Sequence, residues 1–256
     1  MIKPYYETDN GRLYHGDCLD IMREMESDTV QCVVTSPPYN KALNRNYHPS
    51  DSWQTKTGLK IIYGKYDDDM DENKYQKWQI EILNRCIYLL KSSGNIFYNH
   101  KNRTVNHHII TPWQWLLKIQ GYVKQEIIWF TKSFVEIDKI KFLPGTERIY
   151  WIVKNEAEPF FNPENAKYTD VWEIPPSRGK YRYEHPAPYP ITIASRCIDS
   201  GSDENSIILD PFLGSGTTAV ACERLNRRWI GIEISKEYCD IAVERIKREV
   251  AQPRFA

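Results

Sequence analysis

The amino-acid sequence predicts an α/β fold in which helices cover both faces of a mostly parallel sheet. Short apolar runs alternate along the chain with segments of helical periodicity, which is the pattern of parallel strands joined by crossover helices. Two of these apolar runs end in turns rich in glycine or proline. The chain has 256 residues, which is long enough for one sizeable core, so we expect a single domain over residues 1–256.

Seven segments have the short apolar pattern of a strand. No helical segment separates the fourth from the fifth, so those two are expected to form an antiparallel hairpin at the edge of the sheet. The expected strands cover residues 12–14, 30–35, 95–98, 125–130, 148–153, 206–210 and 228–232.

Six segments between and after these strands have the pattern of a helix. In the second, Trp78, Ile82 and Ile87 recur at helical spacing. The third has Pro112 near its start and Gly121 as its stop. The expected helices cover residues 19–25, 75–90, 112–120, 191–198, 217–225 and 236–250.

Two long stretches, residues 40–73 and 154–185, lack an apolar period. Connections of this length inside a compact domain are usually functional or disordered. In the second stretch, basic residues such as Lys167 alternate with aromatic ones such as Tyr168 and Trp172. That mixture suits nucleic acid, and packing around a neighbouring helix is the alternative.

The stretch from Asp210 to Thr218, read as Asp-Pro-Phe-Leu-Gly-Ser-Gly-Thr-Thr, joins an apolar strand to the start of a helix. Its glycines allow the backbone to approach a ligand closely, and the helix start offers free N–H groups. About twenty residues further on, the next strand ends at Glu233. A carboxylate at that strand tip can accept hydrogen bonds from ribose hydroxyls, so the pattern predicts a nucleoside-containing ligand.

A second strand ends in Ser36, Pro37, Pro38 and Tyr39. Proline has no N–H and restricts the residue before it, so this tip is a rigid rim with outward carbonyl acceptors. The rim also carries a hydroxyl and an aromatic face. Such a rim can stack on a planar base and accept hydrogen bonds from its exocyclic amine.

At these two motifs the chain resembles the amino-group DNA methyltransferases that use S-adenosylmethionine. The catalytic motif at residues 35–39 precedes the cofactor loop at residues 210–218, which is the order of the beta group of that family. Gly16-Asp17-Cys18 and the stretch His185-Pro186-Ala187-Pro188-Tyr189-Pro190 match further family motifs. The resemblance implies a Rossmann-like sheet with circularly permuted motifs, in which residues 40–73 and 154–185 face DNA.

The same resemblance implies roles for individual residues. Ser36, Pro37, Pro38 and Tyr39 would hold the target base, which must be flipped out of the duplex. Asp17 would bind the adenine amine of the cofactor. The cofactor-binding residues that the family implies are Asp17, Asp210, Phe212, Gly214, Gly216, Thr217, Glu233, His185 and Pro186. Thr217 and Thr218 have a second possible role, which is to cap the helix that begins there.

Ser36 favours the N4 amine of cytosine as the methyl acceptor, because cytosine enzymes of the family often carry serine at this position. The N6 amine of adenine is the alternative. Three more distant alternatives are an RNA methyltransferase, a dinucleotide oxidoreductase and a DNA-binding module without catalysis. The loop at residues 210–218, called the glycine loop below, lacks the third glycine that an oxidoreductase would have.

Composition sets the remaining expectations. The chain carries 34 basic and 34 acidic residues, so net charge alone does not indicate DNA binding. Six cysteines without close pairs predict buried thiols in a reducing compartment and no metal site.

No apolar run has the length of a membrane span or a signal peptide, so we expect a cytoplasmic protein. Double-stranded DNA is the expected partner; a cognate restriction endonuclease is possible, and the protein is a monomer or a homodimer.

Overall fold

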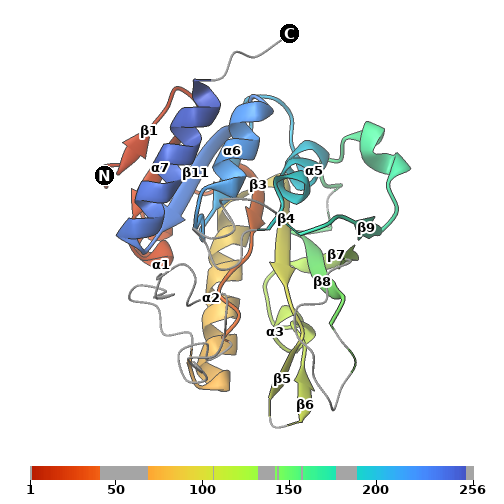
Figure 1. Ribbon diagram of the computed structural model, residues 1–256. Coiled ribbons are helices and arrows are strands. Elements are labelled where there is room, and N and C mark those ends of the chain that lie inside the picture. The colour runs from red at the N-terminus through yellow and green to blue at the C-terminus, as the bar shows by residue number, and fades with distance from the viewer. Residues whose placement is uncertain are drawn as a thin grey trace.

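A nine-stranded sheet runs through the computed structural model, which describes residues 2–40, 69–105, 107–131, 142, 144–156, 158–176 and 189–251. The strand order is β1-β2-β11-β10-β3-β4-β8-β7-β9, and β5 and β6 form a separate hairpin (Figure 1). The strands are β1 (Tyr6–Glu7), β2 (Gly11–His15), β3 (Val30–Thr35), β4 (Leu90–His100), β5 (Arg103–Val105), β6 (His108–Ile110), β7 (Tyr122–Phe130), β8 (Thr146–Val153), β9 (Val171–Glu173), β10 (Ile207–Asp210) and β11 (Arg228–Glu233).

Helices cover both faces of this sheet, as the sequence predicts. One core includes side chains of α1, α2 and α3, and the other includes side chains of α5, α6 and α7 (Figure 1). The helices are α1 (Cys18–Arg23), α2 (Glu72–Leu89), α3 (Trp113–Leu116), the 3₁₀ helix η1 (Pro163–Lys167), α5 (Ile191–Gly201), α6 (Thr217–Arg224) and α7 (Lys236–Val250).

The central strands β2, β11, β10, β3 and β4 are parallel to one another. All six residues of β3 are buried, which is expected of a strand covered on both faces. Because parallel strands end at the same edge, His15, Glu233, Asp210, Thr35 and His100 all lie along the carboxyl edge of the sheet. This edge is where open α/β sheets bind their ligands.

The α/β class is confirmed, but two details of the sheet differ from expectation. All seven expected strands are present, and β1 and β9 add one short strand at each end. Strands of two and three residues are too short to show an alternating pattern. The expected hairpin of β7 and β8 forms, yet it does not lie at the edge, because β9 pairs with β7 beyond it. The antiparallel strand at an edge is β1.

Two long stretches were expected to be irregular. Residues 41–68 and 177–188 lie outside the described residues, and so does Ala157. The described part of the second stretch contains two short elements, η1 and β9, and no other helix or strand between residues 158 and 176. The guanidinium of Arg196 in α5 lies 4.1 Å from the ring centre of Tyr168 and 4.8 Å from that of Trp172. These two aromatic rings therefore pack around a helix residue, which was the alternative to nucleic-acid contact.

All six cysteines are free and buried, as predicted. Within the described ranges, no helix has both the length and the apolar character needed to cross a membrane.

Candidate active site

The two motifs singled out in the sequence lie on neighbouring strands. β3, which leads into Ser36, pairs directly with β10, which leads into the glycine loop. The Thr35 hydroxyl donates to Asp210 Oδ1 over 2.8 Å, and the Thr218 hydroxyl lies 3.5 Å from the Val34 carbonyl. The two strand tips are therefore joined side by side at the carboxyl edge.

Asp210 is the polar centre of this junction. Its carboxylate accepts hydrogen bonds from the Thr35 hydroxyl, from the Phe212 N–H at 3.0 Å and from the Thr218 hydroxyl at 2.5 Å. Burial raises the pKa of Asp210 to about 6, although these hydrogen bonds oppose the shift. The side chain thus shapes the turn that carries the loop.

The glycine loop has the conformation that only glycine adopts easily. Gly214 has φ 53° and Gly216 has φ 86°. A Cβ at Gly216 would also lie only 3.1 Å from the Ala242 Cβ of α7. The loop therefore combines left-handed turns with close backbone packing beneath it.

Glu233 at the tip of β11 holds this loop in place. Its carboxylate accepts from the Gly214 N–H at 2.9 Å and from the Ser235 N–H at 2.8 Å. Burial raises the pKa of Glu233 to about 7. An ionised carboxylate has about four acceptor positions, so Glu233 keeps the capacity to accept from ribose hydroxyls.

Asp17 and Phe212 complete the edge on this side. Asp17 follows β2, next to β11, and the Gly16 N–H donates to the Glu233 carbonyl at 2.9 Å. Asp17 is also the N-cap of α1: its Oδ1 accepts from the Leu19 N–H at 2.8 Å. The Phe212 ring meets the Trp78 ring edge-on, with 5.5 Å between ring centres. Carboxylates and an apolar wall at three adjacent strand tips fit a ligand made of a base and a ribose.

The two threonines at the start of α6 differ in their contacts. The N-cap is Gly216, and no side chain caps the helix, so the capping role considered for Thr217 and Thr218 is wrong. Thr217 Oγ1 lies 3.4 Å from a guanidinium nitrogen of Arg245 in α7. Thr218 instead bonds Asp210 and the phenol of Tyr189. Sequence reasoning assigned Thr217 to the loop and missed the bridging role of Thr218.

Side chains of α2 and β4 contact the proline rim, which is residues 36–39, and fix its position. The Tyr75 phenol donates to the Pro38 carbonyl over 2.8 Å and also contacts His100 Nε2 at 2.7 Å. The His100 ring packs against the Tyr39 ring, with 4.6 Å between centres. Ser36 Oγ and Tyr39 Oη are hydrogen-bonded at 2.8 Å. These contacts fix the rim before any substrate is present.

Three polar residues next to the rim were missed by sequence reasoning: Asn99, Lys101 and Glu147. Asn99 Nδ2 donates to Tyr39 Oη at 3.0 Å, and Tyr39 Oη lies 3.3 Å from Glu147 Oε2. Lys101 Nζ forms an ion pair with Glu147 Oε1 at 2.9 Å. Asn99 and Lys101 lie at the end of a parallel strand, and that position was the signal available. Glu147 begins an antiparallel strand and belongs to no recognised motif.

Two predicted cofactor residues, His185 and Pro186, lie outside the described residues. Tyr189 from the same motif is described, packs against the core and reaches Thr218. All the other predicted site residues lie at the carboxyl edge or directly follow it.

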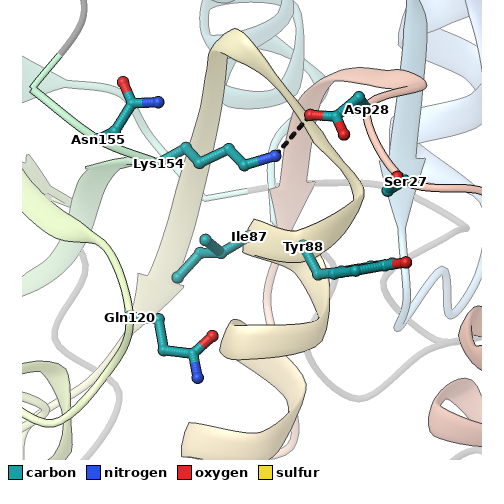
Figure 2. A pocket seen from close by; sticks show the side chains of 7 residues that line it. All are labelled: Ser27, Asp28, Ile87, Tyr88, Gln120, Lys154 and Asn155. Atoms are coloured by element: carbon teal, nitrogen blue, oxygen red, sulfur yellow. Dashed lines mark hydrogen bonds and ion pairs between the residues drawn. The ribbon is translucent and has the colours of Figure 1, made fainter.

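A surface cavity of about 400 Å³ lies elsewhere (Figure 2). Ser27 and Asp28 in its lining precede β3, and Lys154 follows the antiparallel β8, so the cavity belongs to the opposite edge of the sheet. Lys154 Nζ pairs with Asp28 at 2.6 Å across it. This cavity is separate from the two motifs.

Fold and site together define a Rossmann-like α/β protein with a glycine loop and a proline rim at adjacent strand tips, the edge where such sheets bind ligands. The family model described as "DNA methylase" matches residues 30–244, and the chain belongs to this family. It is 31% identical to the type II methyltransferase M.ScaI of Streptomyces caespitosus, over 99% of this chain and 86% of that protein. It is 30% identical to M.HpaI of Haemophilus parainfluenzae, over 93% of this chain and 74% of that protein.

Solved structures share the fold. The cytosine-N4-specific PvuII DNA methyltransferase superimposes with a TM-score of 0.77 at 20% identity, covering 95% of this chain and 89% of that chain. The Thermus thermophilus protein TTHA0409, described as a putative DNA modification methylase and solved in complex with S-adenosyl-L-methionine, has a TM-score of 0.69 at 22% identity, covering 94% of this chain and 96% of that chain.

Proposed function

We infer that this DNA methyltransferase transfers a methyl group to the N4 amine of cytosine in double-stranded DNA. The observation that carries the choice of base is Ser36 at the first position of the proline rim, beside the glycine loop. The PvuII enzyme, whose name states cytosine-N4 specificity, shares the fold and supports the same choice. The N6 amine of adenine is the second candidate, because the rim geometry accommodates an amine of either base.

The cofactor is S-adenosylmethionine, which supplies an activated methyl group on a sulfonium. The chain's own residues would bind it at the tips of β2, β11 and β10. Asp17 would accept from the adenine amine, and Glu233 from the ribose hydroxyls. The backbone of Gly214 and Gly216 would lie against the rest of the molecule, with His185 and Pro186 near the methionine end. The left-handed glycines and the acceptor capacity of Glu233 support this assignment.

The rim prepares the target amine for attack. An exocyclic amine is a poor nucleophile because its lone pair is delocalised into the ring. Hydrogen bonds from the amine to Ser36 Oγ and to the Pro37 carbonyl would favour the pyramidal nitrogen of the transition state. Tyr39 would stack on the base, which is extruded from the duplex. Alignment of the amine with the methyl group is then mainly a matter of positioning.

The relatives support a biological setting for this proposal. M.ScaI and M.HpaI are type II methyltransferases, so a cognate restriction endonuclease is the partner we expect besides DNA. We further expect one catalytic domain over residues 1–256, present as a monomer or a homodimer in the cytoplasm.

Base analysis of the product tests the proposal. The purified protein is incubated with methyl-labelled S-adenosylmethionine and duplex DNA, and the DNA is digested to nucleosides. Label in N4-methylcytosine is the expected result, and label in N6-methyladenine would select the second candidate. Absence of label from both nucleosides across a range of duplexes would contradict the proposed reaction.

A further inference from the structure

Glu147 is a carboxylate connected to the rim, and no motif assigns it a role. It is the second residue of β8, which runs antiparallel to β4 and so brings its amino end to the carboxyl edge of the sheet. Its side chain is only 12% exposed. It lies 108 residues along the chain from Tyr39, yet Tyr39 Oη is 3.3 Å from its Oε2.

The hydrogen bonds around Glu147 have a defined direction. The Asn99 amide nitrogen lies 3.4 Å from Ser36 Oγ, 3.0 Å from Tyr39 Oη and 3.3 Å from Glu147 Oε2, and it can only donate. An ionised carboxylate can only accept. The Tyr39 phenol must therefore donate to Glu147, which leaves the Ser36 hydroxyl to donate to Tyr39 at 2.8 Å.

This direction leaves a lone pair of Ser36 Oγ available for the target amine, on the assignment under Proposed function. The path then runs from the amine to Ser36, to Tyr39 and to Glu147 through two hydrogen bonds of 2.8 and 3.3 Å. Lys101 Nζ forms an ion pair with the other oxygen, Glu147 Oε1, at 2.9 Å. Burial and the charge of Glu147 raise the pKa of Tyr39, so the phenol keeps its proton in the resting enzyme.

We propose that Glu147 receives the proton released by methyl transfer, through Ser36 and Tyr39. This inference rests on the proposed function. The amine nitrogen forms its bond to the methyl carbon while the carbon–sulfur bond breaks, and the electron pair of that bond stays on sulfur as a neutral thioether. One N–H proton passes to Ser36 Oγ as the Ser36 proton passes to Tyr39 Oη and the Tyr39 proton passes to Glu147 Oε2. Glu147 then returns the proton to water.

Other titratable groups lie near this path. Besides Tyr39 and Lys101, they are His100, which packs on the Tyr39 ring, and the pair of Glu126 and Arg148 at 3.5 Å. Residue alternation along β8 places Arg148 on the other face of the sheet from Glu147. Glu126 is therefore a neighbouring carboxylate off the path, and Glu126→Gln is a matched control.

The test is the pH profile of single-turnover methylation of duplex DNA. In the wild type, the rate should fall at acid pH, because a protonated Glu147 cannot accept; the buried carboxyls of Asp210 and Glu233 add to this fall in every variant. Glu147→Gln should lower the rate about 100-fold or more, the usual contribution of a positioned proton acceptor, and should make the acid limb shallower by one proton. Glu147→Asp should restore part of the rate together with the limb. Glu126→Gln should keep both the rate and the limb.

A second variant tests the path without altering the carboxylate. Tyr39→Phe keeps the ring but removes the hydroxyl, so it should lower the rate as Glu147→Gln does. The double variant should be no slower than the slower single one, since both changes interrupt the same path. The affinity for S-adenosylmethionine, measured by calorimetry, should stay within about twofold in every variant. If Glu147→Gln does not fold, Tyr39→Phe and Glu147→Asp carry the test.

Two results would overturn the inference. One is a Glu147→Gln enzyme as fast as the wild type. The other is a slow Glu147→Gln enzyme whose acid limb is as steep as that of the wild type, which would assign Glu147 a purely structural role. A wild type that labels neither base overturns the proposed function and this inference with it, whereas an active wild type with an equally active variant overturns this inference alone.

Discussion

At the scale of the residue, the two carboxylates that hold the glycine loop in place, Asp210 and Glu233, are both buried. Asp210 and Glu233 each accept hydrogen bonds from the loop, and burial raises the pKa of Asp210 to about 6 and that of Glu233 to about 7. Ionisation at neutral pH is therefore less favourable in the folded protein than in the unfolded chain. A raised carboxyl pKa means that the folded state gains stability from these groups as the pH falls, not as it rises.

The substitution Glu233→Gln tests the sign of this dependence of stability on pH. In the wild type, ionising the buried Glu233 lowers the free energy of unfolding as the pH rises from about 4.5 to about 7. The variant has no carboxyl group at this position to ionise. The free energy of unfolding of the variant minus that of the wild type should therefore rise by about 3 kcal/mol over this range and then level off. Urea unfolding at a series of pH values measures it. A difference that stays constant with pH would show that Glu233 is not perturbed.

Asp17 caps helix α1, and we propose that it also binds the adenine amine of the cofactor. Asp17→Asn separates the two, because Asn is as good an N-cap as Asp but carries no charge and offers a single acceptor oxygen. We expect the dissociation constant for S-adenosylmethionine to rise about tenfold, with the free energy of unfolding changed by less than about 0.5 kcal/mol. Calorimetric titration and urea unfolding give the two values.

The matched control for that prediction is Asp20→Asn in the same helix. Asp20 is exposed and pairs with Arg23 at 2.8 Å, so its loss should leave cofactor affinity unchanged. Equal affinities for wild type and Asp17→Asn would leave Asp17 with capping alone.

At the scale of the element, the hairpin of β5 and β6 is tied to the helix beneath the proline rim. Arg103 in β5 is 6% exposed and forms two hydrogen bonds of 2.9 Å with the Glu72 carboxylate in α2. Its guanidinium also lies 4.8 Å from the ring centre of Tyr75. Because Tyr75 bonds the Pro38 carbonyl, this link positions the rim as well as joining two elements.

Arg103→Met should lower the free energy of unfolding by about 2 kcal/mol, since it leaves a partly buried carboxylate without its bidentate partner. It should also lower the methylation rate while leaving cofactor affinity nearly unchanged. Arg12→Met is the control: Arg12 pairs with Glu7 at a site where both side chains are more than half exposed, and its loss should cost less than about 0.5 kcal/mol. Equal stabilities of the two variants would contradict the anchoring role.

At the scale of the whole molecule, one sheet connects the first strand of the chain with the last. β11 lies between β2 and β10, so residues from both ends of the sequence pair side by side within it. We therefore expect unfolding in urea to be one cooperative transition, with far- and near-ultraviolet circular dichroism giving the same midpoint. S-adenosylmethionine at about 100 times its dissociation constant should add about 2.7 kcal/mol. Two separate transitions would contradict a single domain.

Local features of the sequence were sufficient for the class of the fold and for the two motifs. β3 and β10 are apolar runs that stop at proline or glycine, and such stops depend on residues adjacent in the chain. For the same reason α7 begins and ends where its periodicity indicates. β1 and β9 were not predicted, because strands this short are stabilised by their pairing with β2 and β7 and not by a pattern of their own.

The sequence by itself determined that a glycine loop and a proline rim occur on strand tips, because each is a local pattern of backbone conformation. Only the tertiary structure decided which groups surround them. Thr218 reaches Asp210 across only eight residues of sequence, but Glu147 reaches Tyr39 because β8 returns antiparallel beside β4. Contacts of that kind depend on the order and direction of strands, which arise from packing over the whole sheet and leave no mark in the neighbouring residues.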